Sequence, residues 1–228
     1  MTDLQRLTGD ALVRALKQAY PTVDTAVFAA GRPWRILRPR SAEDLLDDDD
    51  FDRDGKIPYW AEVWPSAPVL ADRLAARPGR GAALLELGCG VGLLALVAQA
   101  AGYRALATDY YPEALDFVRA NAWRNDQVPP ATRVVDWRRL PADLGRFDRV
   151  IAADVLYEPA HADLIVAVLE RTLAEGGLAL IADPGRPTAA RFADRCASRG
   201  LAVERVDTPI SGPGLQVVIH TYEVRRPT

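Results

Sequence analysis

Cysteine and histidine are scarce in this chain, which holds two of each. Cys89 and Cys196 lie far apart, and neither belongs to a Cys-x-x-Cys pair or to a Cys/His cluster. This scarcity argues against a structural zinc site and suits a reducing cytoplasm. His161 and His220 lie outside every motif, with no nucleophile beside them, so both are interpreted as structural.

Long apolar runs, a leader and an excess of basic charge are also missing. The apolar runs are too short and too interrupted to cross a bilayer, and the N-terminal stretch MTDLQRLTGDALVRAL lacks the apolar core of a signal peptide. A net charge of −3 gives no general electrostatic footprint for nucleic acid. Lys17 and Lys56 are the only lysines, and the preference for arginine is interpreted as a GC-rich coding bias. We therefore expect a cytoplasmic, bacterial protein that binds neither membranes nor nucleic acid.

What the chain does contain is a regular alternation of strand and helix patterns. Its 228 residues suffice for one α/β domain with a substantial core. Continuous apolar strands that alternate with helices indicate a parallel sheet covered on both faces, and two final strands without a helix between them indicate an antiparallel edge strand. The expected fold class is therefore α/β, a doubly wound, mostly parallel, Rossmann-like sheet of seven strands. Strands are expected at residues 82–86, 104–108, 132–135, 149–153, 178–182, 201–206 and 215–224, and helices at 66–76, 92–101, 112–121, 161–173 and 189–199, with Gly176 and Gly177 capping the fourth helix.

The N-terminal quarter carries a different pattern. Leucines at roughly helical spacing predict a helix over residues 3–19. Residues 26–39 predict a short hairpin with its turn near Gly31. We therefore expect residues 1–57 to form a helix, hairpin and acidic-loop extension to a main domain that covers residues 58–228.

The acidic loop, residues 47–54, partly matches a calcium-binding loop. Counted from Asp50, oxygen ligands and a glycine occupy positions one, three, five and six of an EF-hand loop, but position twelve is Ala61, and Glu62 comes one residue late. The favoured interpretation is an acidic rim that steers a basic protein segment. A solvated loop without a role and a calcium site remain alternatives.

A glycine-rich turn joins the first core strand to the next helix, in the stretch ELGCGVGL of residues 86–93. Such a turn lets the backbone approach a ligand at the carboxyl end of the sheet. Leu93 departs from the dinucleotide fingerprint, and the Gly-Lys-Ser/Thr of a phosphate loop is missing. Asp109 ends the following strand, where a carboxylate can hold ribose hydroxyls. The alternative is a tight turn without a ligand.

ELGCGVGLLAL, followed by ATDYYPEAL, resembles the first two motifs of the seven-strand S-adenosylmethionine-dependent methyltransferases. The resemblance implies S-adenosyl-L-methionine as cofactor, with the glycines facing its methionine part and the acid after the second strand binding its ribose. It also implies that Trp64 lines the cofactor site on the methionine side, that Trp137 lies by the adenine and that the Ala153 backbone contacts the cofactor. For either tryptophan, packing in the core without a ligand contact is the alternative. The cofactor-binding residues expected are Trp64, Glu86, Gly88, Cys89, Gly90, Asp109, Tyr110, Trp137 and Ala153.

Three further stretches narrow the resemblance. DVLY (residues 154–157) follows the fourth strand, PYWAEVWPS (58–66) precedes the glycine turn, and DPGRP (183–187) follows the fifth strand. Together they resemble the protein lysine methyltransferases that carry a DxxY motif, most closely the branch acting on the electron-transfer flavoprotein β-subunit. The resemblance implies that this β-subunit is the protein substrate. Alternatives are a small amine or another protein, such as a ribosomal one, as acceptor, a cofactor-binding module without turnover, and a nicotinamide-dependent oxidoreductase, which the residue after the glycine turn disfavours.

Asp154 and Tyr157 of this motif are the expected catalytic residues. Methyl transfer needs a neutral amine, yet a lysine of pKa about 10.4 is only ~0.1% neutral near pH 7.4. Desolvation in a narrow channel lowers that pKa. We therefore assign Asp154 to holding and orienting the ε-amine and not to acting as a strong base, and Tyr157 to lining the channel. The alternative is that Asp154 caps the following turn while Tyr157 packs. The oligomeric state stays open, with a monomer favoured.

Overall fold

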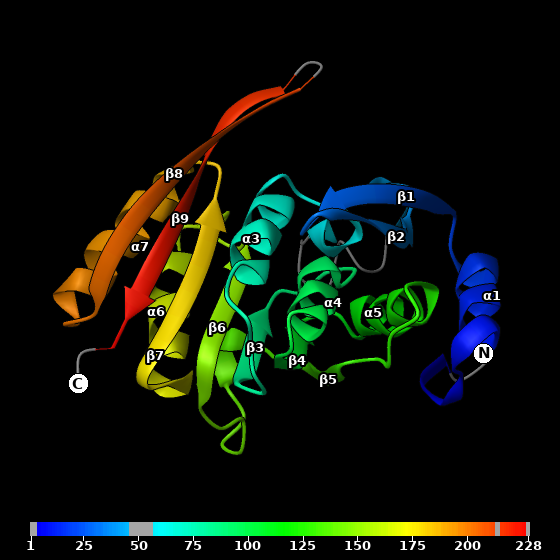
Figure 1. The fold of residues 1–228 in the computed structure, drawn as a ribbon, viewed down its shortest axis with the longest axis horizontal. Helices are drawn as coiled ribbons and strands as arrows, with labels where there is room; N and C mark the ends of the chain where they lie inside the picture. The colour runs from blue at the N-terminus through cyan, green and yellow to red at the C-terminus, as the bar shows by residue number, and fades with distance from the viewer. Residues whose placement is uncertain (1–3, 46–56, 213–214, 227–228) are drawn as a thin grey trace.

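The computed structural model describes residues 4–45, 57–212 and 215–226, which form a seven-strand sheet and a separate two-strand sheet. The larger sheet has the strand order β5-β4-β3-β6-β7-β9-β8, and β3 to β7 run parallel (Figure 1). The reversed strand is β9, which lies between β7 and the edge strand β8. The doubly wound, mostly parallel sheet predicted from the sequence is confirmed. Its strands are β3 (Ala83–Leu87), β4 (Arg104–Asp109), β5 (Ala131–Val134), β6 (Phe147–Ala153), β7 (Leu173–Asp183), β8 (Ala202–Gly212) and β9 (Leu215–Arg225).

Helices cover both faces of this sheet, as the uninterrupted apolar strands require. Neighbouring residues of one strand point to opposite faces, so Leu84 enters one buried cluster and Leu85 the other. The first cluster takes its helical side chains from α1 (Gly9–Ala19), α3, α4 and α5, and the second from α6 and α7. These helices are α3 (Ser66–Ala75), α4 (Leu93–Ala100), α5 (Pro112–Arg124), α6 (His161–Thr172) and α7 (Pro187–Ser198).

Three predicted boundaries are wrong. The strand expected at residues 201–206 extends to Gly212, because its distal half pairs with β9. The pair Gly176–Gly177 does not cap a helix, because α6 ends at Thr172 and β7 begins at once, with Leu173 paired to Phe147 of β6. The first helix is broken into a 3₁₀ turn, η1 (Leu4–Arg6), and α1 (Gly9–Ala19), which begins at a glycine with φ of +55°. A left-handed residue interrupts a right-handed helix, so leucine spacing alone overestimated its length.

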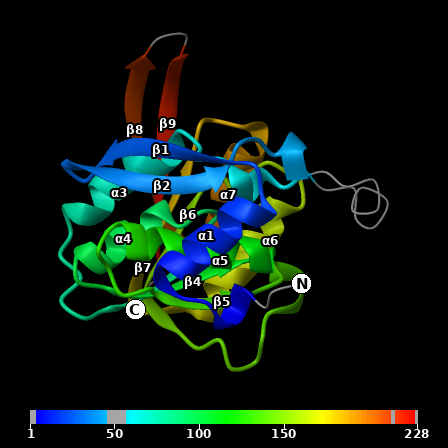
Figure 2. The same ribbon diagram turned by 90° about the vertical axis from the view of Figure 1, so that its right-hand side faces the viewer.

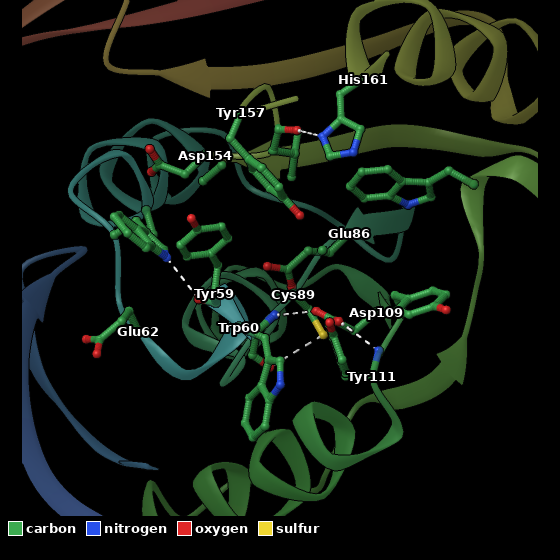
Figure 3. A pocket seen from close by; sticks show the side chains of 18 of the residues that line it. Tyr59, Trp60, Glu62, Glu86, Cys89, Asp109, Tyr111, Asp154, Tyr157 and His161 are labelled. Atoms are coloured by element: carbon green, nitrogen blue, oxygen red, sulfur yellow. Dashed lines mark hydrogen bonds between the residues drawn. The ribbon is translucent and has the colours of Figure 1, made fainter. Parts of the chain in front are cut away.

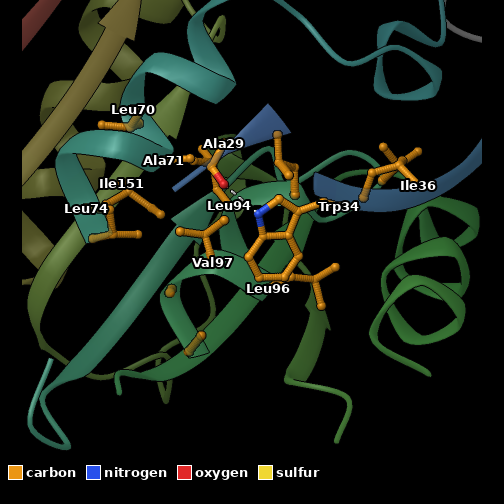
Figure 4. Close-up of a cluster of buried hydrophobic side chains, with 14 of the residues drawn as sticks. Ala29, Trp34, Ile36, Leu70, Ala71, Leu74, Leu94, Leu96, Val97 and Ile151 are labelled. Carbon is orange, nitrogen blue, oxygen red and sulfur yellow. Dashed lines mark hydrogen bonds between the residues drawn. The ribbon is translucent and has the colours of Figure 1, made fainter. Parts of the chain in front are cut away.

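The predicted hairpin is confirmed, and it is longer than expected. Strands β1 (Thr22–Ala29) and β2 (Arg32–Pro39) pair antiparallel from their ends to the turn. Trp34 is buried, its indole N–H donates to Ala29 O at 2.9 Å, and its ring lies among side chains of α4 (Figure 4). The described part of the N-terminal segment is therefore built onto the core of the domain.

Two asparagines of α5 attach β2 to that core. The Asn121 side chain accepts from Leu37 N at 2.7 Å and donates to Leu37 O at 2.9 Å. One turn later, Asn125 accepts from Arg35 N at 3.0 Å and donates to Arg35 O at 2.9 Å. Residues four apart lie on one face of a helix. The two asparagine side chains therefore make the backbone hydrogen bonds that a neighbouring strand would otherwise make along this edge of β2.

The C-terminal hairpin extends beyond the body of the sheet (Figures 1 and 2). Strands β8 and β9 pair along their length, whereas β7 pairs with β9 only as far as Asp183 and His220. The distal half of the hairpin therefore stands clear of β7, at the edge where the parallel strands end.

The acidic loop 47–54, with its predicted steering role and its calcium alternative, lies outside the described residues. Among the residues that are described, no three His, Cys, Asp or Glu side chains gather as a metal site. No helix in the described ranges is long and apolar enough to cross a membrane.

Candidate active site

A cavity of about 490 Å³ opens where β3, β4 and β6 end (Figure 3). This volume lies in the range of small-molecule binding sites. The carboxyl ends of neighbouring parallel strands meet at one edge, so the glycine turn, Asp109 and Asp154 come together although they are far apart in sequence. A 3₁₀ turn, η3 (Tyr59–Ala61), closes the cavity from the segment before α3.

The glycine turn brings bare backbone to the cavity wall. Gly88 and Gly90 have φ of +64° and +51°, a region that favours glycine. A Cβ on Gly90 would lie 3.0 Å from Trp60 O, and one on Gly88 would lie 3.1 Å from a methyl group of Val155. A side chain at either position would therefore press against η3 or against Val155 and displace the wall of the cavity.

Asp109 forms the acidic end of β4, as the sequence predicts. Its carboxylate accepts from Gly90 N at 2.9 Å and from Tyr111 N at 3.1 Å. Burial raises the pKa of Asp109 to about 6, although these backbone hydrogen bonds oppose the rise. A carboxylate can accept about four hydrogen bonds, so both oxygens keep capacity for hydroxyl donors in the cavity.

Glu86 provides a second acid at the same place. Its side chain is buried, and within the described residues its Oε2 has no hydrogen-bond partner. Burial, followed by the nearby charge of Asp109, raises the pKa of Glu86 well above its usual range. A buried acceptor without a donor is costly, so the cavity is chemically suited to a ligand that carries hydroxyl or ammonium donors.

The other predicted cofactor residues, Trp64, Cys89, Tyr110, Trp137 and Ala153, also line the cavity. The Trp64 indole donates to Tyr59 O at 3.0 Å. Trp137 lies beside the glycine turn, because a Cβ on Gly88 would sit 3.5 Å from its ring. The structure thus brings the predicted set together. Contact between each member and a cofactor stays a prediction.

Tyr157 lies in an aromatic group at the other end of the cavity (Figure 3). Its ring is 5.3 Å from that of Tyr59 and 4.7 Å from that of His161, and the Tyr59 ring is 5.8 Å from that of Trp64. Burial raises the pKa of Tyr157 to about 12, so its hydroxyl stays protonated at neutral pH. These rings, with Tyr59 contributed by η3, form an apolar wall with polar tips.

Asp154 has protein partners for both of its carboxylate oxygens. Its Oδ2 accepts from Ser66 N at 3.1 Å, and its Oδ1 accepts from Arg186 at 2.9 Å. Burial raises the pKa of Asp154, and the hydrogen bonds from Ser66 and Arg186 oppose the rise. The backbone at Asp154 has φ of +59°, an uncommon conformation for a residue with a side chain. Asp154 is one of the residues that line the cavity, its carboxylate is fixed by these partners, and its contact with an amine remains a prediction.

Sequence reasoning did not assign Tyr59, Glu62 or His161 to the site, although all three line the cavity. His161 is interpreted above as structural, and its Nδ1 does lie 2.7 Å from Val155 O, a contact that holds the strand-end loop. The signal for Tyr59 was its place in the quoted stretch PYWAEVWPS. Its orientation depends on the 3₁₀ turn, which that stretch does not specify.

Comparison with known proteins identifies the class. The family described as "Methyltransferase domain" matches residues 85–181. Magnesium protoporphyrin IX methyltransferase from Synechocystis PCC 6803, solved with bound SAM, has the same fold, with a TM-score of 0.54 and 18% identity over 79% of this chain and 98% of that chain. The chain therefore has the fold and the domain of the seven-strand methyltransferases, whose cofactor is S-adenosyl-L-methionine.

Two curated relatives narrow the class. The electron transfer flavoprotein beta subunit lysine methyltransferase of Rattus norvegicus is 34% identical over 80% of this chain and 73% of its own length. The corresponding protein of Xenopus laevis is 33% identical over 57% of this chain, and the match spans only 53% of the frog protein. The chain belongs to the same family as these lysine methyltransferases.

Cofactor affinity is expected to fall as the pH drops below about 6, because the predicted ribose contact of Asp109 needs an ionised carboxylate to accept from two hydroxyls and burial raises its pKa to about 6. Above pH 7 the affinity should be nearly constant, since the carboxylate stays charged. Isothermal titration calorimetry between pH 5 and 8 with S-adenosylhomocysteine, which lacks the sulfonium charge, measures the effect. Asp109→Asn should bind weakly with a flat pH profile. The same slope in this variant would assign the titration to another group, such as Glu86.

Proposed function

We propose that this protein is a lysine N-methyltransferase that acts on a protein, with the electron-transfer flavoprotein β-subunit as the best candidate acceptor. Relatives named for that activity support the proposal. The observation that carries it is the aromatic wall of Tyr59, Trp64 and Tyr157, which lies in the same cavity as the glycine turn and Asp109. One end of the cavity suits a nucleoside and the other suits an alkyl ammonium group.

The two acids and the backbone of the glycine turn would hold the cofactor. S-adenosylmethionine, when bound, supplies a methyl group on a positively charged sulfur. Asp109 would accept from the ribose hydroxyls, and Glu86 would offer its Oε2, which has no partner among the described residues, to a further donor. A fixed acidic frame of this kind positions the reactants, which is the main requirement of an in-line transfer.

The aromatic wall would prepare the acceptor amine. Rings around a lysine side chain exclude water, and desolvation lowers the pKa of the amine, which favours the neutral form. The ring faces also attract the amine while it is still charged. Asp154 is proposed to orient one amine N–H and Tyr157 to line the channel. With a raised pKa, the Tyr157 hydroxyl acts there as a hydrogen-bonding group and not as a base.

Labelled methyl transfer tests the proposed function. The purified enzyme is mixed with radiolabelled S-adenosylmethionine and either the purified β-subunit or a lysate of source cells that lack the enzyme, and the products are separated on a gel. Methyllysine in the β-subunit, identified by mass spectrometry, is the expected result. A different labelled protein would keep the class and replace the substrate. Label in small molecules alone, or cofactor binding without transfer, would contradict the proposal.

A further inference from the structure

The turn after β7, residues 183–187, sends an arginine side chain to the carboxylate of Asp154. Arg186 Nη1 lies 2.9 Å from Asp154 Oδ1 and 2.8 Å from Asp183 Oδ2. The two carboxylates come from the ends of neighbouring strands, β6 and β7, and only 2% and 0% of their side-chain surface is exposed. One guanidinium nitrogen therefore joins two buried acids beside the cavity.

Asp183 fixes the position of this arginine. Its Oδ1 accepts from Gly185 N at 2.8 Å and from Arg186 N at 2.7 Å, while Oδ2 receives the guanidinium. Gly185 has φ of +91°, and a Cβ there would lie 3.0 Å from His220 Nε2 of β9. The backbone of the turn is thus held from both sides, and Arg186 is aimed at Asp154 before any substrate arrives.

The group formed by Asp154, Asp183 and Arg186 carries more negative than positive charge. Two buried carboxylates and one guanidinium leave one net negative charge next to the aromatic wall. Asp183 has two backbone donors of its own, whereas Asp154 has the backbone N–H and the side chain of Ser66 as neutral partners and Arg186 as its cation. Without the arginine, Asp154 is therefore the acid that would take up a proton, because a buried charge without a partner is unfavourable.

We propose that Arg186 is a positioning residue for methyl transfer: held by Asp183, it keeps the Asp154 carboxylate charged and directed so that Asp154 can orient the acceptor amine. This inference rests on the proposed lysine methyltransferase function. It assigns to the DPGRP turn the task of maintaining a buried negative charge at the amine end of the cavity.

Other titratable groups line the same cavity as Asp154. They are Tyr59 and Glu62 from the η3 segment, Tyr157, Glu158 and His161 from the segment after β6, and Glu86 and Asp109 from the ends of β3 and β4. His220 of β9 touches the turn at Gly185. These groups are unchanged in a variant of Arg186, so a change in pH dependence between variant and wild type reports the loss of the guanidinium.

Arg186→Met is expected to move the acid limb of the kcat/KM pH profile upward by about one pH unit or more, because Asp154 becomes protonated below its raised pKa. The measurement is methyl transfer to the protein acceptor between pH 5.5 and 9, and activity of the variant should recover at the alkaline end. Arg186→Lys keeps the positive charge and should restore most of the wild-type profile. Arg191→Met removes an arginine from α7 whose ion pair with Asp163 is exposed, and should change nothing.

A second readout does not depend on the acceptor. Carbon-13 NMR of aspartate-labelled protein, with the Asp154 signal assigned from its loss in Asp154→Asn, follows the carboxyl group directly. The expected result is a higher titration midpoint of Asp154 in Arg186→Met than in wild type. If wild type transfers no methyl group to protein, the proposed function fails while this titration still decides the role of Arg186. An unchanged midpoint, or a kinetic profile that is only scaled down, would overturn the inference.

Discussion

Replacement of Asp154 with asparagine is expected to lower kcat/KM for the protein acceptor by about a hundredfold, which corresponds to about 3 kcal/mol of lost transition-state stabilisation. Asparagine has the same shape, but it cannot carry the negative charge that attracts and orients the amine. Steady-state kinetics with the methylated protein as product measure the effect. Affinity for S-adenosylhomocysteine should change little, because the cofactor end of the cavity is unaltered.

This substitution separates the two roles considered for Asp154. The alternative predicted from the sequence was that Asp154 caps the turn that follows it, and the backbone group that its side chain accepts from is instead Ser66 N at the start of α3. The side-chain oxygen of the introduced asparagine can still accept from Ser66 N, so a residue that acts only as a cap would lose little. Asp163→Asn is the matched control, since Asp163 also pairs with arginine but lies exposed on α6. Activity of Asp154→Asn within about threefold of wild type would remove Asp154 from the amine site. A parallel loss of thermal stability and cofactor binding would assign the effect to folding.

The parallel part of the fold could be predicted because its signals are local. Uninterrupted apolar stretches indicate strands, helical spacing of apolar residues indicates helices and glycines mark where helices end, and each of these signals lies within a few residues of its element. The junction between α6 and β7 was missed because Leu173 takes its strand conformation from pairing with Phe147, which is distant in sequence. The asparagine contacts of α5 with β2 escaped prediction for the same reason, since Asn121 and Leu37 are 84 residues apart.

The candidate site, too, could be predicted where its signals are local and not where it depends on contacts between segments distant in sequence. The ends of parallel strands lie at one edge of a sheet, so the expectation of a parallel sheet was enough to place the glycine turn, Asp109 and Asp154 at the same edge. The partner of Asp154 was not predictable, because DPGRP gives no indication that Arg186 folds back across the turn to the end of β6. The sequence therefore predicted Asp154 as the acid for the amine, and the structure identified Arg186 as its partner.

Gly92→Ala is expected to lower the free energy of unfolding by about 3 kcal/mol and to weaken cofactor binding. Gly92 precedes α4 with φ of +94°, where a side chain adds strain. Its Cβ would also lie 2.9 Å from a methyl group of Val118 and 3.1 Å from the α-carbon of Val118, so the glycine turn must move away from α5. Urea denaturation measures the first effect and calorimetry with S-adenosylhomocysteine the second.

Gly145→Ala distinguishes the two causes of this destabilisation. Gly145 has φ of +85°, yet nothing lies within 4 Å of an added Cβ, so its variant should lose only about 1 kcal/mol from backbone strain and keep full cofactor affinity. In Gly92→Ala combined with Val118→Ala, the clash with the valine methyl groups disappears while the backbone of α5 stays equally close, so recovery should be partial. Equal effects at Gly92 and Gly145 would show that conformation alone limits this turn. A larger effect at Gly92 that the second substitution partly relieves would show that close packing of α5 against the turn holds the cofactor end of the cavity in shape.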